Sequence, residues 1–293
     1  MSNTANLVLD TKSTLGEGPI WDVDDACLWW INIEEGLVHR FDPATQDNET
    51  FDIGQRLGTV VRRASGGLVL GGHHGFIAFD PQSGEQTIMA DPESDKPTNR
   101  FNDGKCDPAG RLWAGTLNFE DESQPLGALY CLDCDGNVRQ HLDGVCISNG
   151  IVWTSDARTM YYIDSPTRKV DAFDFDNATG TISNRRTAVT LADGWGNPDG
   201  MTIDSEDKIW VALWAGWGVA RFDPVSGELL EKIDVPASQV TACAFGGPSL
   251  DDLYVTTARR GLEGEALAKE PAAGGLFHAK VNVRGVPSSR FAG

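Results

Sequence analysis

The sequence has few basic residues and no long apolar run. Lys and Arg number 24 against 43 Asp and Glu, so the formal net charge is −19. A surface of that sign repels phosphate backbones and anionic lipid head groups over about 8 Å at physiological ionic strength. No stretch approaches the roughly 20 apolar residues that a membrane-spanning helix needs. We therefore expect neither a nucleic-acid partner nor a membrane.

The N-terminus and the cysteines lack the features of a secreted protein. Residues 1–19 contain no basic segment followed by an apolar run. The six cysteines lie mostly within apolar stretches, which is typical of buried thiols rather than of a disulfide framework. For the one CxxC, Cys131 and Cys134, packing is favoured over a zinc or redox role because no second ligand pair follows. These absences predict a cytoplasmic protein, either a monomer or a small homo-oligomer.

Several familiar catalytic motifs are absent. There is no G-x-S-x-G nucleophile elbow, no H-E-x-x-H zinc motif and no G-x-x-x-x-G-K-[ST] phosphate loop. "DCDGNV" and "DFDNATG" resemble the start of an EF-hand loop, but neither has the closing Glu or flanking helices. The chemistry of this chain must therefore come from another arrangement.

A strand-and-turn phrase recurs six times along the chain. The copies begin at residues 38, 76, 129, 170, 219 and 276, at an average spacing of roughly 48 residues. In "FIAFDPQSGE", for example, apolar residues lead to an Asp-Pro turn that ends in Gly, and a second hairpin precedes each copy. The pattern predicts an all-β fold, a six-bladed β-propeller with four antiparallel strands per blade, as one domain over 1–293. The alternative, a long β-sandwich, is disfavoured by the regular spacing. One turn of helix is expected at "EGEALAKEP".

Acid and amide residues open the innermost strand of four of the six units. They are Glu17 in "GEGPIW", Asn102 and Asp103 in "FNDG", Asn149 in "SNGIVW" and Asp199 in "PDGMTID". Innermost strands of a propeller surround its central channel, so we expect these side chains to converge on the axis. The alternative is that each residue only caps its own strand or turn.

Converging carboxylates repel one another unless a cation lies between them. Glu17, Asn149 and Asp199 offer only oxygen ligands, which suit hard divalent ions, and three protein ligands leave room for water and substrate. We expect one divalent metal cation, Ca²⁺ first, with Mg²⁺, Mn²⁺, Zn²⁺ and Fe²⁺ as alternatives.

Longer motifs carry a resemblance to a known family. The runs, in order, are "LGEGPIWD", "RFNDGKCDPAGRLWAGT", "ISNGIVW", "YYIDS", "VDAFDFD", "ISNRR", "PDGMTID", "WVALW", "FGGP", "LYVTTAR" and "AGGLF". From about residue 10 to the C-terminus the chain resembles the gluconolactonase and SMP-30 (regucalcin) family, which includes bacterial sugar lactonases.

The resemblance implies a six-bladed propeller enzyme, a lactonase that uses one divalent metal to hydrolyse sugar lactones to aldonic acids. Glucono-, galactono- and xylono-lactone are candidate substrates. Carried over by position, the implied metal ligands are Glu17, Asn149 and Asp199, and the implied substrate-binding residues are Arg100, Asn102 and Glu120. Asp199 is also our candidate for assisting the attack of water, because a ligand carboxylate can lie within hydrogen-bond reach of that water. Asp103 is expected beside the site.

Some alternatives stay open at this point. The same metal site could hydrolyse other esters such as phosphotriesters, or the propeller could bind calcium without catalysis. Arg100 could instead form a surface ion pair, and His73 and His74 could lie either on a surface loop or at the channel mouth. Trp195, Trp214 and Trp217 could line a sugar pocket or pack between blades. The lactone's ring size and stereochemistry are expected to be read by loops 118–126 and 192–197.

Overall fold

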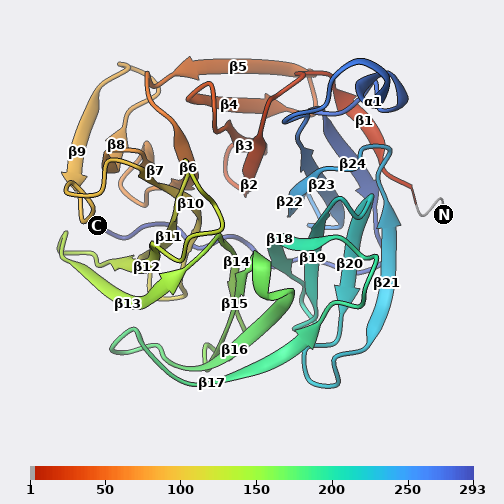
Figure 1. Ribbon diagram of the computed structural model, residues 1–293. Coiled ribbons are helices and arrows are strands. Elements are labelled where there is room, and N and C mark those ends of the chain that lie inside the picture. The colour runs from red at the N-terminus through yellow and green to blue at the C-terminus, as the bar shows by residue number, and fades with distance from the viewer. Residues whose placement is uncertain (1–3) are drawn as a thin grey trace.

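Six four-stranded antiparallel sheets surround a central channel in the computed structural model, which describes residues 4–293 (Figure 1). The innermost strands of neighbouring sheets contact one another around the whole ring. This arrangement confirms the predicted six-bladed propeller. Residues 1–3 of the predicted domain lie outside the described residues.

The first three blades follow the chain from inside to outside. Blade 1 consists of β2 (Gly16–Asp22), β3 (Cys27–Asn32), β4 (Leu37–Asp42) and β5 (Asp47–Asp52). Blade 2 consists of β6 (Leu57–Arg62), β7 (Leu68–Gly72), β8 (Gly75–Phe79) and β9 (Gln86–Ala90). Blade 3 consists of β10 (Asn99–Cys106), β11 (Leu112–Asn118), β12 (Gly127–Leu132) and β13 (Val138–Val145).

The next two blades repeat this order, whereas the sixth does not. Blade 4 consists of β14 (Ser148–Trp153), β15 (Thr159–Asp164), β16 (Lys169–Asp176) and β17 (Thr181–Thr190). Blade 5 consists of β18 (Asn197–Ile203), β19 (Ile209–Trp214), β20 (Gly218–Phe222) and β21 (Leu229–Asp234). Blade 6 combines β22 (Val240–Gly246), β23 (Asp252–Thr257) and β24 (Leu276–Lys280) with β1 (Asn6–Leu9) as its outermost strand.

Blade 6 closes the ring by joining the two ends of the chain. β1 pairs antiparallel with β24, so the first strand completes the last sheet. The C-terminal segment then crosses behind the ring (Figure 1). Its residues Gly285 and Phe291 form isolated β-bridges with Asp204 and Arg63, respectively. Phe291 is fully buried at its end. Pairing between distant chain ends resists opening of the ring, because β1 must separate from β24 before the two ends can move apart.

Helix is scarce in the described part of the chain. A 3₁₀ turn, η1 (Ser165–Thr167), and the short α1 (Gly264–Lys269) lie in loops, and α1 falls within the predicted "EGEALAKEP". Within residues 4–293, no helix has the length and apolarity needed to cross a membrane.

Burial divides each blade into inner and outer strands. The inner strand β14 is buried along its whole length, whereas the outer strand β17 is mostly exposed. Apolar side chains fill the spaces between neighbouring blades, as where Trp210 on β19 meets Phe245 on β22 edge to face with ring centroids 5.6 Å apart. The inner strands are therefore covered on both faces, and the polar residues that they carry are buried as well.

A buried aspartate fixes the first hairpin in two of the blades. Asp107 accepts hydrogen bonds from Trp113 Nε1 (2.9 Å) and from Arg111 Nε (2.6 Å). In blade 5, Asp204 accepts from Trp210 Nε1 at 2.9 Å, six residues along the chain as in blade 3. Each carboxylate also accepts backbone N–H groups of its own turn, so it ties the turn to a core tryptophan.

Each innermost strand shifts register against its neighbour near its start. In the blades that carry polar residues the shifts fall between Glu17 and Ile20, Phe101 and Gly104, Asn149 and Ile151, and Pro198 and Met201. Such bulges bend a strand and redirect its side chains. Glycine at 200 also lets two inner strands approach closely, because a Cβ there would lie 2.5 Å from Ala242 Cβ. The bulges and the close approach turn the polar side chains toward the channel.

Candidate active site

A cavity of about 220 Å³ occupies one end of the channel. Its polar lining includes Glu17, Asn102, Asn149 and Asp199, which come from four different blades. Leu15, Leu117, Ile147 and Trp214 supply the apolar part of the lining. The predicted convergence of the inner-strand residues is thus present in the structure, although they are separated by up to 182 positions in the sequence, from residue 17 to residue 199.

Three carboxylates lie close enough to perturb one another. Glu17, Asp103 and Asp199 are 4%, 4% and 7% exposed. Burial, with the Asp103 carboxylate second, raises the pKa of Glu17 to about 8. Burial followed by the Glu17 charge raises the pKa of Asp199 well above its ordinary value. Such a group strongly favours a bound cation over three ionised, uncompensated carboxylates.

Asp103 is held at one oxygen only. Its Oδ1 accepts the Gly104 N–H at 2.6 Å, whereas its buried Oδ2 has no hydrogen-bond partner in the protein. Burial raises the pKa of Asp103, as it does that of Glu17, and the Lys105 charge offsets part of both increases. Lys105 Nζ donates to the Met201 carbonyl. The cationic side chains near the carboxylates are Lys105 and Arg100, so three acids face two bases. An unpartnered, buried carboxylate oxygen in an acidic group fits a divalent cation.

A line of hydrogen bonds connects the polar residues of three blades. Asn102 Nδ2 donates to Asn149 Oδ1 at 2.9 Å and to the Ser148 carbonyl at 2.7 Å. Asn149 Nδ2 in turn donates to Ser165 Oγ (2.7 Å), and Ser165 donates to the Pro198 carbonyl (2.6 Å) next to Asp199. These contacts fix the orientation of the Asn149 amide group, with its oxygen toward Asn102 and its nitrogen toward Ser165.

Arg100 is a buried cation without a carboxylate partner. It is 2% exposed, and none of the ion pairs among residues 4–293 includes it. Its Nη1 donates to Asn102 Oδ1 (2.7 Å) and to the Phe101 carbonyl (3.0 Å), while its Nε has no partner. Burial lowers the pKa of Arg100 to about 10. The alternative of a surface ion pair is therefore wrong, and the side chain forms part of the cavity lining.

Glu120 is placed differently from the other predicted site residues. It is exposed and does not line the cavity, and its backbone N–H donates to Asn118 Oδ1 at 3.0 Å. Two residues further on, Glu122 lines the cavity instead. A substrate contact by Glu120 stays a prediction, whereas Glu122 is the carboxylate that this loop presents.

Sequence reasoning missed four residues of the site. They are Lys105, Glu122, Ser165 and Arg260. Lys105 lies two positions after Asp103 on the same inner strand, so the alternation of side chains offered a signal. Glu122, Ser165 and Arg260 lie in loops between the second and third strands of their blades, where the repeat gives no position to compare.

The structure shows where the histidines and tryptophans lie for which the sequence allowed two locations. His73 and His74 stack with ring centroids 4.4 Å apart outside the cavity, and His73 Nε2 contacts the Pro97 carbonyl at 2.9 Å. Trp214 lines the cavity, Trp195 packs against Phe222, and Trp217 is 43% exposed. One of the three tryptophans, Trp214, therefore has the predicted wall position.

The cysteines behave as the sequence suggested. All six are free, and Cys131 is buried on β12 while Cys134 is exposed in the following turn. Asp22, Asp25 and Cys27 place possible ligand atoms within 4.8 Å of one another, away from the cavity. Arg62 and Arg290 already lie 2.6 and 2.9 Å from the Asp22 carboxylate, and burial raises the pKa of the Cys27 thiol to about 11. The guanidinium groups thus offset the negative charge of that cluster, and the Cys27 thiol stays protonated.

The chain is a six-bladed propeller in which buried acid and amide side chains line a cavity at one end of the channel. A family model described as "SMP-30/Gluconolactonase/LRE-like region" matches residues 15–259. The chain belongs to this family, as the sequence motifs indicated.

Relatives match over nearly the whole chain. Regucalcin from Danio rerio is 41% identical over 288 residues, covering 98% of this chain and 97% of that protein. A Bacillus subtilis protein named as a sugar lactone lactonase is 37% identical over 289 residues, covering 99% of both. Among solved structures, a calcium-binding regucalcin from Agrobacterium tumefaciens superimposes with a TM-score of 0.94 at 28% identity, covering 98% of this chain and 97% of that one.

Proposed function

We propose that this protein is a metal-dependent sugar lactonase, which hydrolyses an aldono-lactone such as glucono-, galactono- or xylono-lactone to the aldonic acid. The observation that carries the proposal is that the buried carboxylates of Glu17 and Asp199 line one cavity together with Asn149 and Arg100. The buried carboxylate of Asp103 lies close enough to raise the pKa of both acids. Family membership and the lactonase name of a relative support the same reaction. A volume of about 220 Å³ suits a small substrate, since pockets for larger ligands usually exceed about 300 Å³.

The ligands of the cation in this proposal are Glu17, Asn149 and Asp199. Their oxygen atoms suit Ca²⁺ first, and Mg²⁺, Mn²⁺, Zn²⁺ or Fe²⁺ as alternatives. When bound, the cation supplies Lewis-acid polarisation of the lactone carbonyl and stabilises charge that develops on oxygen. Asp103, with its unpartnered Oδ2, adds negative charge and an acceptor for a water molecule at the same place.

The residues of the chain supply the proton transfers and the orientation. Asp199 takes a proton from the water that attacks the carbonyl carbon, and returns it to the ring oxygen as the C–O bond breaks. Arg100, which lines the cavity, donates from its guanidinium group to the substrate or to the carboxylate product, and Asn102 holds Arg100 and Asn149 in place.

A cytoplasmic location remains part of the proposal. Six unpaired cysteines, four of them buried, are usual in a reducing compartment. The proposed partner is the small-molecule lactone itself.

The test is a pH-indicator assay of lactone opening, corrected for spontaneous hydrolysis. Glucono-, galactono- and xylono-lactone are assayed in EDTA and again after each of the five cations is restored. We expect activity that disappears in EDTA and returns with at least one cation. If no lactone is opened with any cation, the proposal is wrong; a phosphotriester assay and Ca²⁺ calorimetry then separate an esterase of another kind from a calcium-binding propeller.

A further inference from the structure

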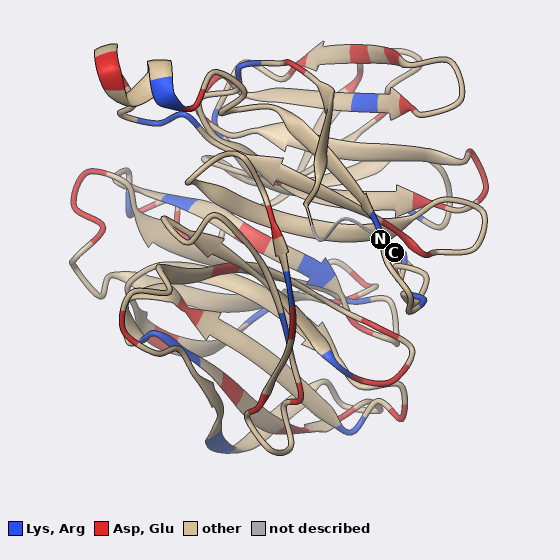
Figure 2. Cartoon of the chain, turned by 90° about the vertical axis from the view of Figure 1, so that its right-hand side faces the viewer, with Lys and Arg blue, Asp and Glu red and all other residues tan. Residues whose placement is uncertain are grey.

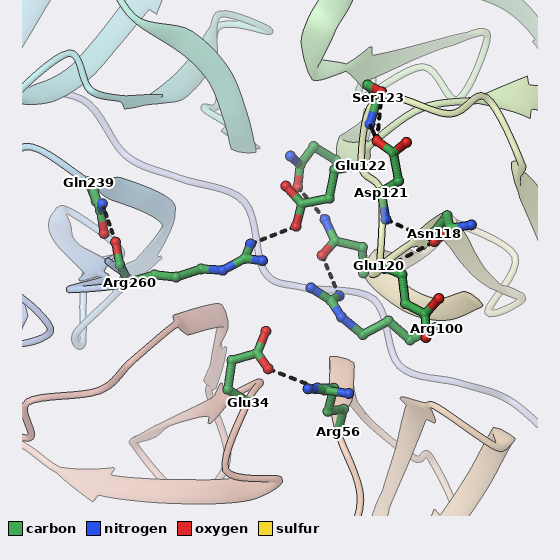
Figure 3. A network of polar contacts seen from close by, with 12 residues as sticks. Glu34, Arg56, Arg100, Asn118, Glu120, Asp121, Glu122, Ser123, Gln239 and Arg260 are labelled. Carbon is green, nitrogen blue, oxygen red and sulfur yellow. Dashed lines mark hydrogen bonds and ion pairs between the residues drawn. The ribbon is translucent and has the colours of Figure 1, made fainter. Parts of the chain in front are cut away.

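An ion pair spans the mouth of the cavity. Arg260 Nη1 lies 2.6 Å from Glu122 Oε1, although 138 positions separate the two residues (Figure 3). Glu122 belongs to blade 3 and Arg260 to blade 6, which are opposite each other in a ring of six. Both side chains line the cavity, so the pair forms part of its outer wall.

Hydrogen bonds hold the backbone of Arg260 and the turn that precedes Glu122. Gln239 Nε2 donates to the Arg260 carbonyl at 2.8 Å. On the other side, Asn118 Oδ1 accepts the N–H groups of Glu120 (3.0 Å) and Asp121 (3.1 Å), and thereby shapes the turn that presents Glu122. Figure 3 shows the long Arg260 side chain extending to Glu122 from its own side of the channel. Anchored loops reduce the entropic cost of holding two long side chains together.

A second ion pair on the same face provides a comparison. Arg56 Nε lies 2.8 Å from Glu34 Oε2, and the Arg56 guanidinium lies over the Phe119 ring at 4.7 Å. These residues come from the loops of blades 1 and 2, and neither Arg56 nor Glu34 lines the cavity. Of the two pairs, the one formed by Glu122 and Arg260 is therefore the one placed to meet a substrate.

We propose that Glu122 and Arg260 are specificity-determining residues that restrict the site to lactones of a single sugar ring. The inference rests on the proposed lactonase function. The carboxylate accepts and the guanidinium donates hydrogen bonds to hydroxyl groups on the side of the sugar away from the reacting carbonyl. A second sugar attached on that side must separate the pair, because the two side chains occupy the outer wall of a cavity of about 220 Å³.

The test compares two substrates that share the reacting ring. Glucono-δ-lactone is compact, whereas cellobiono-δ-lactone carries a glucosyl group on O4. We expect Glu122→Gln and Arg260→Gln each to raise the kcat/KM ratio of the larger to the smaller lactone about five-fold, the size of effect for an ion pair of this exposure. KM for the smaller lactone rises while its kcat changes little. The exchanged pair, Glu122→Arg with Arg260→Glu, returns the ratio toward that of the unmodified protein.

Glu34→Gln is the matched control, because it breaks the neighbouring ion pair without altering the cavity wall. We expect it to leave the ratio unchanged. An unchanged ratio in both single variants, or an equal change in Glu34→Gln, overturns the proposal.

A second measurement separates this inference from the proposed function. The rate at which a coloured chelator removes Mn²⁺ from the protein reports access to the site without any catalysis. We expect about five-fold faster removal in Glu122→Gln and Arg260→Gln than in Glu34→Gln. If the unmodified protein opens no lactone, the proposed function fails. If Mn²⁺ is removed from Glu122→Gln, Arg260→Gln and Glu34→Gln at the same rate, the inference that the Glu122–Arg260 pair limits access to the site fails as well.

Discussion

Asn102 and Asn149 lie on the innermost strands of neighbouring blades, and the Asn102 amide donates to Asn149 Oδ1 at 2.9 Å. Because Asn102 also accepts from Arg100 at 2.7 Å, one side chain orients both a candidate ligand and a candidate substrate-binding residue. The centre is therefore held by contacts between blades rather than within one of them.

Replacing Asn102 tests this positioning role. Asn102→Ala leaves the Asn149 carbonyl oxygen and Arg100 without their shared partner, so we expect Mn²⁺ affinity measured by calorimetry to fall by about 10–100-fold. The exposed Asn137→Ala serves as a control and should bind as the unmodified protein does. Equal affinities for the two variants contradict the role.

Asp199 is the residue on which turnover should depend most. Asp199→Asn removes the proton acceptor and a ligand charge, so we expect kcat for lactone opening to fall by about 10²–10⁴-fold. Circular dichroism should be unchanged, because the amide fits the same space and relieves repulsion from Glu17. Asp135→Asn, in an exposed turn outside the loops expected to contact the lactone, is the control. Wild-type turnover in Asp199→Asn would remove this residue from the mechanism.

Stability without metal should depend on pH through Glu17. Its folded-state pKa is about 8 against an ordinary 4.5, so between these values the folded protein binds more protons than the unfolded chain. Stability then decreases as pH rises, since ∂ΔG/∂pH follows the protons bound by the unfolded minus the folded state. In EDTA we expect the free energy of unfolding to fall by a few kcal/mol from pH 5 to pH 8, because one pKa unit is about 1.4 kcal/mol.

Urea titrations at several pH values measure this dependence. Glu17→Gln should flatten the profile, and a bound divalent cation should flatten it in the unmodified protein. A profile in EDTA that rises steadily from pH 5 to pH 8 contradicts the assignment to Glu17.

The buried aspartate of blade 5 should contribute strongly to stability. Asp204→Ala leaves Trp210 Nε1 and Arg221 Nε without the acceptor they contact at 2.9 and 2.8 Å. Breaking a buried pair of this kind costs about 3 kcal/mol or more, which calorimetric melting will detect as a lower Tm. Asp135→Ala, in an exposed turn, should change stability by no more than about 0.5 kcal/mol. Similar melting temperatures for the two variants contradict the role of Asp204.

The repeat and the inner part of the site could be predicted from the amino-acid sequence alone. The turns of each unit are specified by nearby residues, such as the Asp-Pro and Ser-Gly of "FIAFDPQSGE". Hairpins of this kind depend on only a few neighbouring residues. Glu17, Asn149 and Asp199 could be predicted together because they stand at equivalent positions of a repeated unit around one axis.

The outer part of the site, by contrast, depends on contacts that form only in the folded ring. Glu122, rather than Glu120, lines the cavity because the turn held by Asn118 orients the loop, and its partner Arg260 lies in the opposite blade. The closure of blade 6 by β1 likewise depends on residues at the other end of the chain. Such contacts join segments whose conformation no local pattern specifies, so their partners are fixed only when the ring closes.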